Sequence, residues 1–265
     1  MAQLTVISRE QHAGKRWKRY SSYSFAAADA VAPLVVQELP RACMAVPVGF
    51  VKKDDGYQLV AVQGLQPGRN LLVGGDGRWL AGYVPAVYRG YPFAVATTAD
   101  NGGRQVLCFR EDSGLLVDDD TEGEAFFDAD GKPAKTVSAL IDFLEQVAAS
   151  GQLTARLCAL LDQYGVIAPW NVTLKAGDTE RKVDGLYRID EKALIELPAD
   201  AFEALRQAGA LPLVYAQLLS MQHLSRLGKL ATHRAQAQSA ENQLAGTDGD
   251  LDLEFLHDDG NIRFN

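Results

Sequence analysis

The sequence is poor in the residues that build metal centres and disulfide frameworks. It has 3 cysteines, far apart and odd in number, and 4 histidines among 265 residues. Cys43, Cys108 and Cys158 lie in apolar stretches, where a cysteine most often packs as a small hydrophobic side chain. No His or Cys pair has the spacing typical of a zinc or iron site. We therefore expect neither a disulfide framework nor a bound metal.

Motifs of nucleotide binding and nucleophilic catalysis are lacking too. Gly-Gly-Asp-Gly at 74–77 has neither the spacing of a dinucleotide fingerprint nor the Lys-Ser/Thr of a phosphate loop, which favours a turn between strands. Ser220 and His223 could touch on one helical face, but no Gly-x-Ser-x-Gly elbow accompanies them. We interpret them as a helix cap or a polar surface pair, and we expect no cofactor. A catalytic site assembled from distant positions stays open.

Two acidic segments match a calcium-binding loop only in part. An EF-hand loop needs glycine at its sixth position and glutamate at its twelfth. In segment 118–123, which would begin such a loop, the twelfth position is Ala129. In the segment beginning at Asp248, the sixth position is Leu253. We interpret both as solvated acidic loops.

The charge balance disfavours nucleic acid as a partner. Lys+Arg 26 against Asp+Glu 34 gives a net charge of −8, whereas phosphate binding needs clustered cations. Residues 15–20 do interleave basic side chains with Trp17 and Tyr20, a pattern that can bind single-stranded nucleic acid or an acidic protein surface. We favour the alternative that the rings pack onto the sheet while the cations balance the acidic loops.

No apolar run is long enough to cross a membrane. The longest, 208–221, contains Pro212 and Gln217 and falls short of the roughly 20 residues that a spanning helix needs. No continuous apolar segment follows the cations of residues 1–30, as a secretory signal would require. We expect a cytoplasmic protein with no transmembrane segment, and the sequence also allows association with the cell surface by a route that needs no N-terminal signal.

The hydrophobic patterning predicts an α+β protein with an antiparallel, β-rich N-terminal half and a helical C-terminal half. Runs of β-branched and aromatic residues at 46–52 and 57–62 flank an Asp-Gly pair that favours a hairpin turn. Helical spacing of apolar residues predicts helices over 136–149 and 154–164, with Thr136 as the cap and Gly151 as the end of the first. Further strands are expected at 70–73, 79–83, 105–110, 170–175 and 182–189, short helices from 190 and 198, and a long helix over 210–234.

The last residues have a different pattern. Residues 250–255 alternate acidic and apolar side chains, and the turn signal at 258–261 precedes a short apolar run, so we predict a C-terminal β-hairpin. We divide the chain into a basic and aromatic N-terminal arm (1–24), an α+β domain (25–235), and a linker with an acidic C-terminal hairpin (236–265).

The segment 79–93 gathers large aromatic side chains around one arginine. Aromatic residues with an arginine form the typical composition of a binding hot spot. The same composition suits a packed β core with one salt-bridged arginine, for which Glu38 is a candidate partner. Both interpretations stay open. The candidate partner-binding residues are Trp79, Tyr83, Tyr88, Arg89, Tyr91, Phe93 and Glu38.

Several motifs along residues 20–230 together resemble one protein family. They include Ala-Val-Pro-Val-Gly-Phe at 45–50, Tyr-Val-Pro-Ala at 83–86, Tyr-Arg-Gly-Tyr-Pro-Phe at 88–93 and Gly-Leu-Tyr at 185–187. This series is similar to the SapC family, bacterial proteins named for a link to surface-layer (S-layer) protein genes and sometimes mislabelled as peptide-transport permeases. Gly90 departs from the pattern, because a second basic residue is usual after Arg89.

The resemblance carries no established catalytic residues. It implies a bacterial protein linked to the S-layer or to the modification of outer-membrane receptors, beside halogenase-like or oxygenase-like enzymes. We therefore expect a soluble, non-catalytic module that binds a protein or peptide partner. The alternative is an enzyme, or an accessory subunit of one, that modifies peptide side chains. A nucleic-acid binder ranks last.

Overall fold

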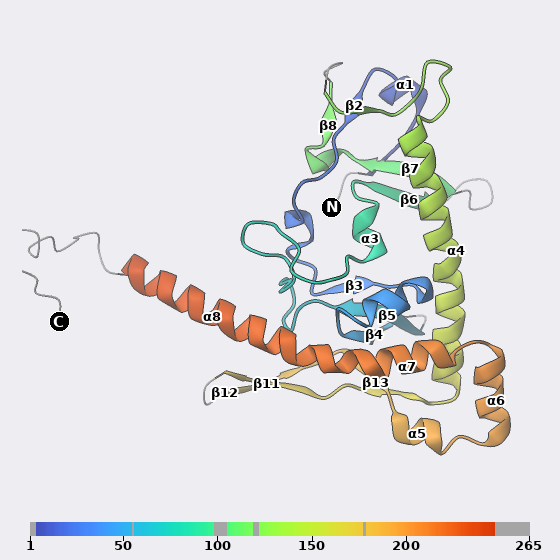
Figure 1. Cartoon of the computed structure of the whole chain (residues 1–265), viewed down its shortest axis with the longest axis vertical. Helices are drawn as coiled ribbons and strands as arrows, with labels where there is room; N and C mark the ends of the chain where they lie inside the picture. The colour runs from blue at the N-terminus through green and yellow to red at the C-terminus, as the bar shows by residue number, and fades with distance from the viewer. Residues whose placement is uncertain (1–3, 55, 98–104, 119–121, 177–178, 247–265) are drawn as a thin grey trace, which may run out of the picture.

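The structure, a computed structural model, describes residues 4–54, 56–97, 105–118, 122–176 and 179–246. Its strands pair in an antiparallel manner and lie mainly in the N-terminal half, while the long helices follow them (Figure 1). The predicted α+β class is confirmed. The predicted C-terminal hairpin lies outside the described residues.

A five-stranded sheet forms the centre of the molecule. Its order is β10 (Ile167–Pro169), β13 (Leu186–Ile189), β4 (Val48–Lys53), β5 (Gly56–Val62) and β3 (Val31–Pro33). The β4–β5 hairpin forms where the sequence predicted it, with Lys53 paired to Gly56. Gly56 has a φ of 121°, a conformation that a residue without a side chain adopts at little cost.

Three smaller sheets complete the β structure. One contains β1 (Leu4–Val6), β7 (Gln105–Arg110) and β6 (Phe93–Thr97), and another contains β8 (Leu116–Val117), β2 (Arg16–Trp17) and β9 (Glu124–Ala125). A two-stranded ribbon joins β11 (Val172–Ala176) to β12 (Thr179–Val183). The strand predicted at 105–110 is therefore confirmed, and the run predicted at 182–189 divides between two strands.

The strands predicted at 70–73 and 79–83 are wrong. This stretch forms a loop whose one described bridge joins Val73 to Trp79. The Asn70 side chain accepts from the Leu72 N–H at 2.8 Å and donates to the Ala26 carbonyl oxygen at 3.0 Å. Asparagine side chains that bond to nearby backbone groups compete with a strand ladder in this way.

Helix α4 (Lys135–Gln163) is continuous where the sequence predicted two helices. Gly151 does not end it, and its N-cap is Ala134 rather than Thr136, with no side-chain cap. Tertiary contacts support the helix on both sides of the glycine. Thr154 is buried and its Oγ1 accepts the Val36 N–H at 2.9 Å. Such contacts outweigh the roughly 1 kcal/mol that glycine costs inside a helix.

The helix predicted at 210–234 also differs from the structure. α7 (Leu211–Ser220) is separated from α8 (Leu224–Gly246) by the 3₁₀ turn η4 (Met221–His223), and α8 runs beyond the predicted end. At this break, Ser220 Oγ accepts the buried Val48 N–H at 2.9 Å. The remaining helical elements are α1 (Arg9–His12), η1 (Ser24–Ala26), η2 (Val36–Glu38), α2 (Leu39–Ala42), α3 (Ala86–Arg89), η3 (Glu111–Ser113), α5 (Glu191–Ile195) and α6 (Ala199–Gln207).

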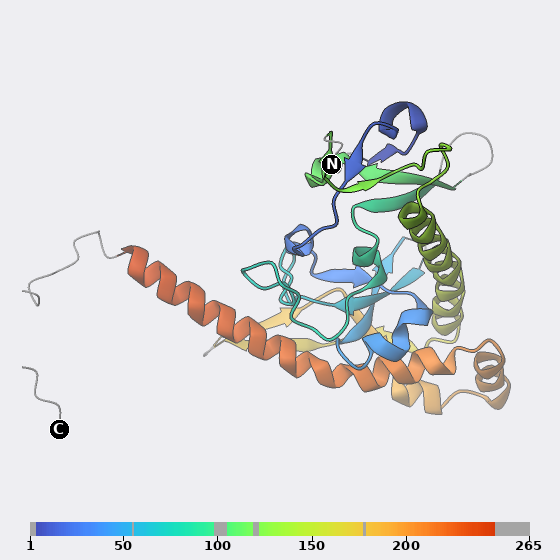
Figure 2. The same ribbon diagram turned by 45° about the horizontal axis from the view of Figure 1, so that its top comes forward.

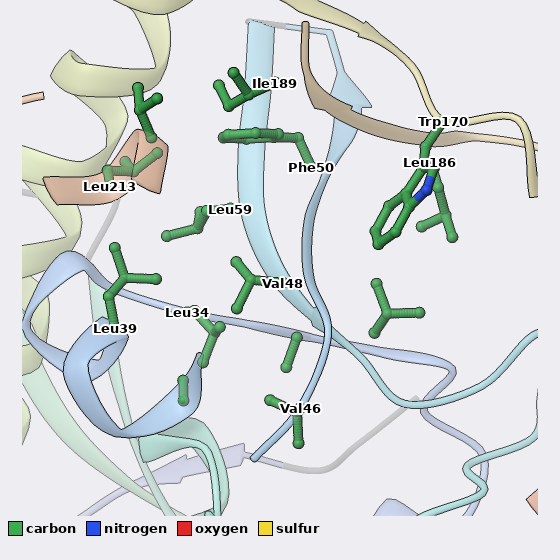
Figure 3. Packing of buried hydrophobic residues seen from close by; sticks show 14 of the residues in the cluster. Leu34, Leu39, Val46, Val48, Phe50, Leu59, Trp170, Leu186, Ile189 and Leu213 are labelled. Carbon is green, nitrogen blue, oxygen red and sulfur yellow. The ribbon is translucent and has the colours of Figure 1, made fainter. Parts of the chain in front are cut away.

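Two hydrophobic cores lie along α4. The main core packs the second half of α4, together with α7, on the five-stranded sheet, and Figure 3 shows Phe50 of β4 beside Ile189 of β13. A smaller aromatic core, made by Trp17, Phe93, Phe109 and Phe126, packs against the first half of α4. Figure 2 shows α4 extending along both regions. Within the described part of the chain, no helix has both the length and the hydrophobicity of a membrane span.

Candidate functional site

The candidate residues of segment 79–93 lie between the five-stranded sheet and the smaller β1–β7–β6 sheet, where α3 is seen in Figure 1. Their burial differs. Tyr83, Tyr88 and Phe93 are buried, as is Glu38, while Trp79 and Tyr91 are partly buried. The Arg89 side chain is 42% exposed. The segment therefore combines interior rings with one charged group that reaches solvent.

Glu38 organises the polar contacts beneath Arg89. Its Oε1 accepts a hydrogen bond from the Tyr83 hydroxyl at 2.8 Å and another from the Ala86 N–H, in the first turn of α3, at 2.6 Å. Its Oε2 accepts the Val35 N–H at 2.9 Å. Burial, then the bond to Glu38, raises the pKa of Tyr83. Tyr83 therefore stays a neutral hydrogen-bond donor at physiological pH.

The Arg89 guanidinium is held by this network and by two rings. Its Nη2 donates to the Tyr83 hydroxyl oxygen at 3.2 Å and lies 3.9 Å from Glu38 Oε1, the ion-pair partner that the sequence suggested. The guanidinium carbon is 5.1 Å from the centre of the Phe143 ring and 5.7 Å from that of Tyr83, within cation–π range. Arginine has five N–H donors. Among the described residues, Tyr83 is its one hydrogen-bond acceptor, so several donors remain available to a ligand.

Two pockets meet at Arg89. The first, here called the aromatic pocket, has a volume of about 520 Å³. The second, here called the Met44 pocket, has a volume of about 480 Å³. No acidic residue lines either one within the part of the chain that the structure describes. The aromatic pocket is lined by Trp17, Arg19, Tyr20, Arg89, Gly90, Tyr91, Phe93, Thr136, Ala139, Leu140 and Phe143. The Met44 pocket is lined by Pro40, Arg41, Met44, Ala45, Gly82, Tyr83, Val84 and Arg89.

Gly90 lies close to α4 in the aromatic pocket. A Cβ atom at this position would lie 2.9 Å from Leu144 Cδ2, the end of a flexible side chain on α4. A side chain at position 90 would therefore require Leu144 to shift. Gly90 has an ordinary helical φ of −80°, so its backbone conformation does not require glycine.

An aromatic layer forms the outer wall of the same pocket. Tyr91 stacks on Phe25 with ring centres 3.7 Å apart and 2° between the planes, and Tyr20 meets Tyr91 edge-on at 6.0 Å. Burial raises the pKa of Tyr20 to about 12. Arg110 lies 5.8 Å from the centre of the Tyr91 ring. These contacts hold the wall in place before any ligand binds.

Besides Glu38, two candidate residues lie outside both pockets. The Tyr88 hydroxyl is 2.9 Å from Gln63 Oε1 and 3.0 Å from Asp29 Oδ2, and burial raises the pKa of Tyr88. Trp79 donates its indole N–H to the Tyr83 carbonyl oxygen at 2.7 Å. Both side chains support the segment from inside and do not line the pockets.

Sequence reasoning missed Phe143 and did not connect Tyr20 with Arg89. Phe143 is a partly buried residue of α4, and Tyr20 comes from the N-terminal cluster. Neither residue has a local motif that would link it to position 89. Only the fold brings them to one pocket.

The basic cluster at residues 15–20 takes the arrangement that we favoured from the sequence. Trp17 is 6% exposed and meets Phe93 edge-on at 4.7 Å. The neighbouring cations pair with an acidic stretch that lies far along the sequence. The pairs are Lys15 with Asp118 at 3.8 Å, Lys18 with Glu122, and Arg19 with Glu124 at 2.6 Å.

The polar groups considered for catalysis bond to the backbone. Ser220 Oγ donates to the Gln217 carbonyl oxygen at 2.6 Å, and His223 Nε2 lies 3.1 Å from the Cys43 carbonyl oxygen. The three cysteines are buried and free, and burial raises the pKa of Cys158 to about 11. Among the described residues, no group of three or more His, Cys, Asp or Glu side chains could hold a metal ion.

Comparison with known proteins gives one match. The model of the SapC family matches residues 7–227, which are most of the chain and include every candidate residue of the site. Neither the comparison with curated proteins nor that with solved structures found a match.

Proposed function

Because the chain belongs to the SapC family, we propose a function for this member that rests on the two pockets beside Arg89. The protein binds a peptide segment of a partner protein, with Arg89 as the central anchor and without chemistry of its own. The observation that carries this proposal is the position of the guanidinium. It is held by the hydroxyl and ring of Tyr83 and by the ring of Phe143, yet the Arg89 side chain is 42% exposed and lines both pockets.

The chemistry of the pockets favours a peptide that joins an acidic or carbonyl group to a large apolar side chain. Arginine donates to a carboxylate in a bidentate manner, which gives both strength and orientation. Beside it, the rings of Tyr20, Phe93 and Phe143 offer apolar surface at a small entropic cost. A volume of about 520 Å³ lies within the range of about 300–1,000 Å³ typical of ligand pockets.

The Met44 pocket extends the proposed peptide site. Met44 is 71% exposed at its edge, and methionine adapts its shape to different partners. A peptide that places its acidic group at Arg89 can thus insert a neighbouring side chain into each of the two pockets. We place this binding in the cytoplasm, with a partner connected to the S-layer or to an outer-membrane receptor, as the family resemblance suggests.

The test compares Arg89→Ala with Arg206→Ala. Arg206 is an exposed arginine of α6 that pairs with Glu203 at 2.6 Å, so its loss matches the change in charge without touching a pocket. An array of eight-residue peptides, each with one Asp or Glu beside Phe or Leu, is screened with wild-type protein. The peptides that bind are then titrated into both variants.

We expect Arg89→Ala to weaken peptide binding by about 10- to 100-fold, as removal of a hot-spot arginine does. Arg206→Ala should bind like wild type, and circular dichroism should show both variants folded. Arg89→Lys keeps the charge but loses the planar donor group, so it should fall between them. Equal affinities for wild type and folded Arg89→Ala would remove Arg89 from the binding site.

A further inference from the structure

The negative charge of the chain is concentrated at its C-terminal end. Residues 247–265, here called the acidic tail, contain six acidic residues and one arginine, which is −5 of the net charge of −8. Within it, residues 250–255 read Asp-Leu-Asp-Leu-Glu-Phe, so carboxylates alternate with large apolar side chains. This is the chemistry that the aromatic pocket favours, because Arg89 lines it together with apolar rings, whereas the other arginine, Arg19, pairs with Glu124.

Helix α8 leads the chain away from this pocket. Arg234 attaches α8 to the body by donating to the carbonyl oxygens of Asn70 at 2.8 Å and Leu71 at 3.2 Å. From there to Gly246 the helix extends about 18 Å, at about 1.5 Å per residue. Figures 1 and 2 both show α8 pointing away from the body, on the side opposite α4, whose first half carries the pocket wall.

This direction favours a pocket on another molecule. Phe255 follows Gly246 by nine residues, which reach about 30 Å at most when fully extended. To enter the pocket of its own chain, the tail would first have to retrace the length of α8 and then pass the body. A pocket on a neighbouring molecule that lies ahead of α8 requires no such path.

We infer that the acidic tail of one copy docks in the aromatic pocket of a second copy, with Glu254 at Arg89 and Phe255 between the pocket rings. This inference rests on the proposed function and names its peptide. Phe255 fits better than Phe264, because Arg263 would bring a positive charge toward Arg19 and Arg89. A contact of this kind makes self-association depend on protein concentration and on ionic strength.

The experiment uses the full chain and measures its mass in solution by sedimentation and light scattering over a range of concentrations. Phe255→Ala and Glu254→Lys change the tail, Arg89→Ala changes the pocket, and Phe264→Ala is the matched control. We expect the first three to weaken self-association at least about tenfold and Phe264→Ala to leave it unchanged. A labelled synthetic peptide of residues 247–265 should bind full-length Phe255→Ala, and added salt should weaken this binding.

The outcomes separate this inference from the proposed function. If acidic peptides of the array bind through Arg89 while the 247–265 peptide does not, the proposed function stands and the tail inference is overturned. If neither class of peptide binds, both fall. A wild-type chain that is monomeric at every concentration overturns docking between copies, even where the tail peptide binds to the Phe255→Ala protein.

Discussion

The two hydrophobic cores that α4 joins differ in size and in the polar groups buried within them. In the main core, the polar side chains that α7 brings to β4 have partners: Gln217 accepts the Ile189 N–H at 3.0 Å and donates to the Val48 carbonyl oxygen at 3.1 Å. In the aromatic core, Trp17 Nε1 is buried without a hydrogen-bond partner among the described residues, and so is Nε2 of the adjoining His12. Burial also lowers the pKa of His12.

The difference indicates that the main core supplies most of the stability, while the aromatic core supports the pocket. The main core has many buried members, whereas the aromatic core has four. Trp17 and Phe93 belong to this small core and also line the aromatic pocket. Rings packed edge-on hold a rigid wall with few side chains. The pocket therefore lies against the smaller of these two cores.

The largest expected effect is the loss of a phenylalanine from either core. Phe50 and Phe126 are both 0% exposed. Phe50→Ala should lower the free energy of unfolding by about 3–5 kcal/mol and affect the whole chain. Phe126→Ala should cost about 3 kcal/mol, at the lower end of the same range, because the smaller core can close on the cavity more readily. Urea denaturation measures both values.

Hydrogen exchange sharpens this comparison. In Phe126→Ala, the amides of β6 and β7 should exchange faster while those of β4 and β5 keep their protection, since regions can open separately. Met44→Ala, at a residue 71% exposed, is the control and should change stability by less than about 0.5 kcal/mol. Equal loss of protection in both sheets would show that the two cores unfold as one.

A smaller effect is expected where a polar side chain completes the main core. Ser220→Ala removes the acceptor of the buried Val48 N–H, which should cost about 1–3 kcal/mol. The matched control is Ser225→Ala, whose exposed hydroxyl donates to the Gln222 carbonyl oxygen, with an expected change near zero. Thermal unfolding gives both values. An unchanged stability of Ser220→Ala would mean that another acceptor or water reaches Val48.

Features set by neighbours in the sequence could be predicted. The Asp-Gly pair gave the β4–β5 hairpin, and Asp190 caps α5 by accepting the Lys192 and Ala193 N–H groups at 3.1 Å and 3.3 Å. Both depend on interactions within a few residues. The contact between Glu38 and Arg89 also agrees with expectation, because a buried carboxylate needs a partner.

Features set by distant contacts could not be predicted. The aromatic pocket needs Tyr20, Arg89 and Phe143, which come from three parts of the chain. No periodic pattern in the sequence indicates that these three residues come together. The strands expected within 70–83 were wrong partly for this reason, since Arg234 donates to the Asn70 carbonyl oxygen from far along the chain, and partly for a local one, since Asn70 accepts the Leu72 N–H. The end of a helix is also decided by packing where the sequence has only a weak stop signal. Gly151 is such a signal, and α4 continues through it.

The smallest expected effect comes from replacing Gly151 in α4, the helix that packs against both cores. Gly151→Ala should stabilise the protein by about 0.5–1 kcal/mol, because alanine restricts the unfolded chain and favours the helix. A Cβ atom there would meet only Val35 Cγ1, at an ordinary 3.9 Å. Thermal unfolding should show a rise of about 2–4 °C for each 1 kcal/mol.

Gly90→Ala is the comparison for this glycine, because its Cβ atom would lie 2.9 Å from Leu144 Cδ2, so this flexible side chain must shift and the gain in stability should be smaller. A larger gain at Gly151 than at Gly90 would show that α4 is continuous through Gly151 and more closely packed near Gly90. If Gly151→Ala destabilised the protein, the helix would need flexibility at its midpoint, and the two cores would then move relative to one another. In that case a ligand in the aromatic pocket should shift the exchange rates of the main core as well.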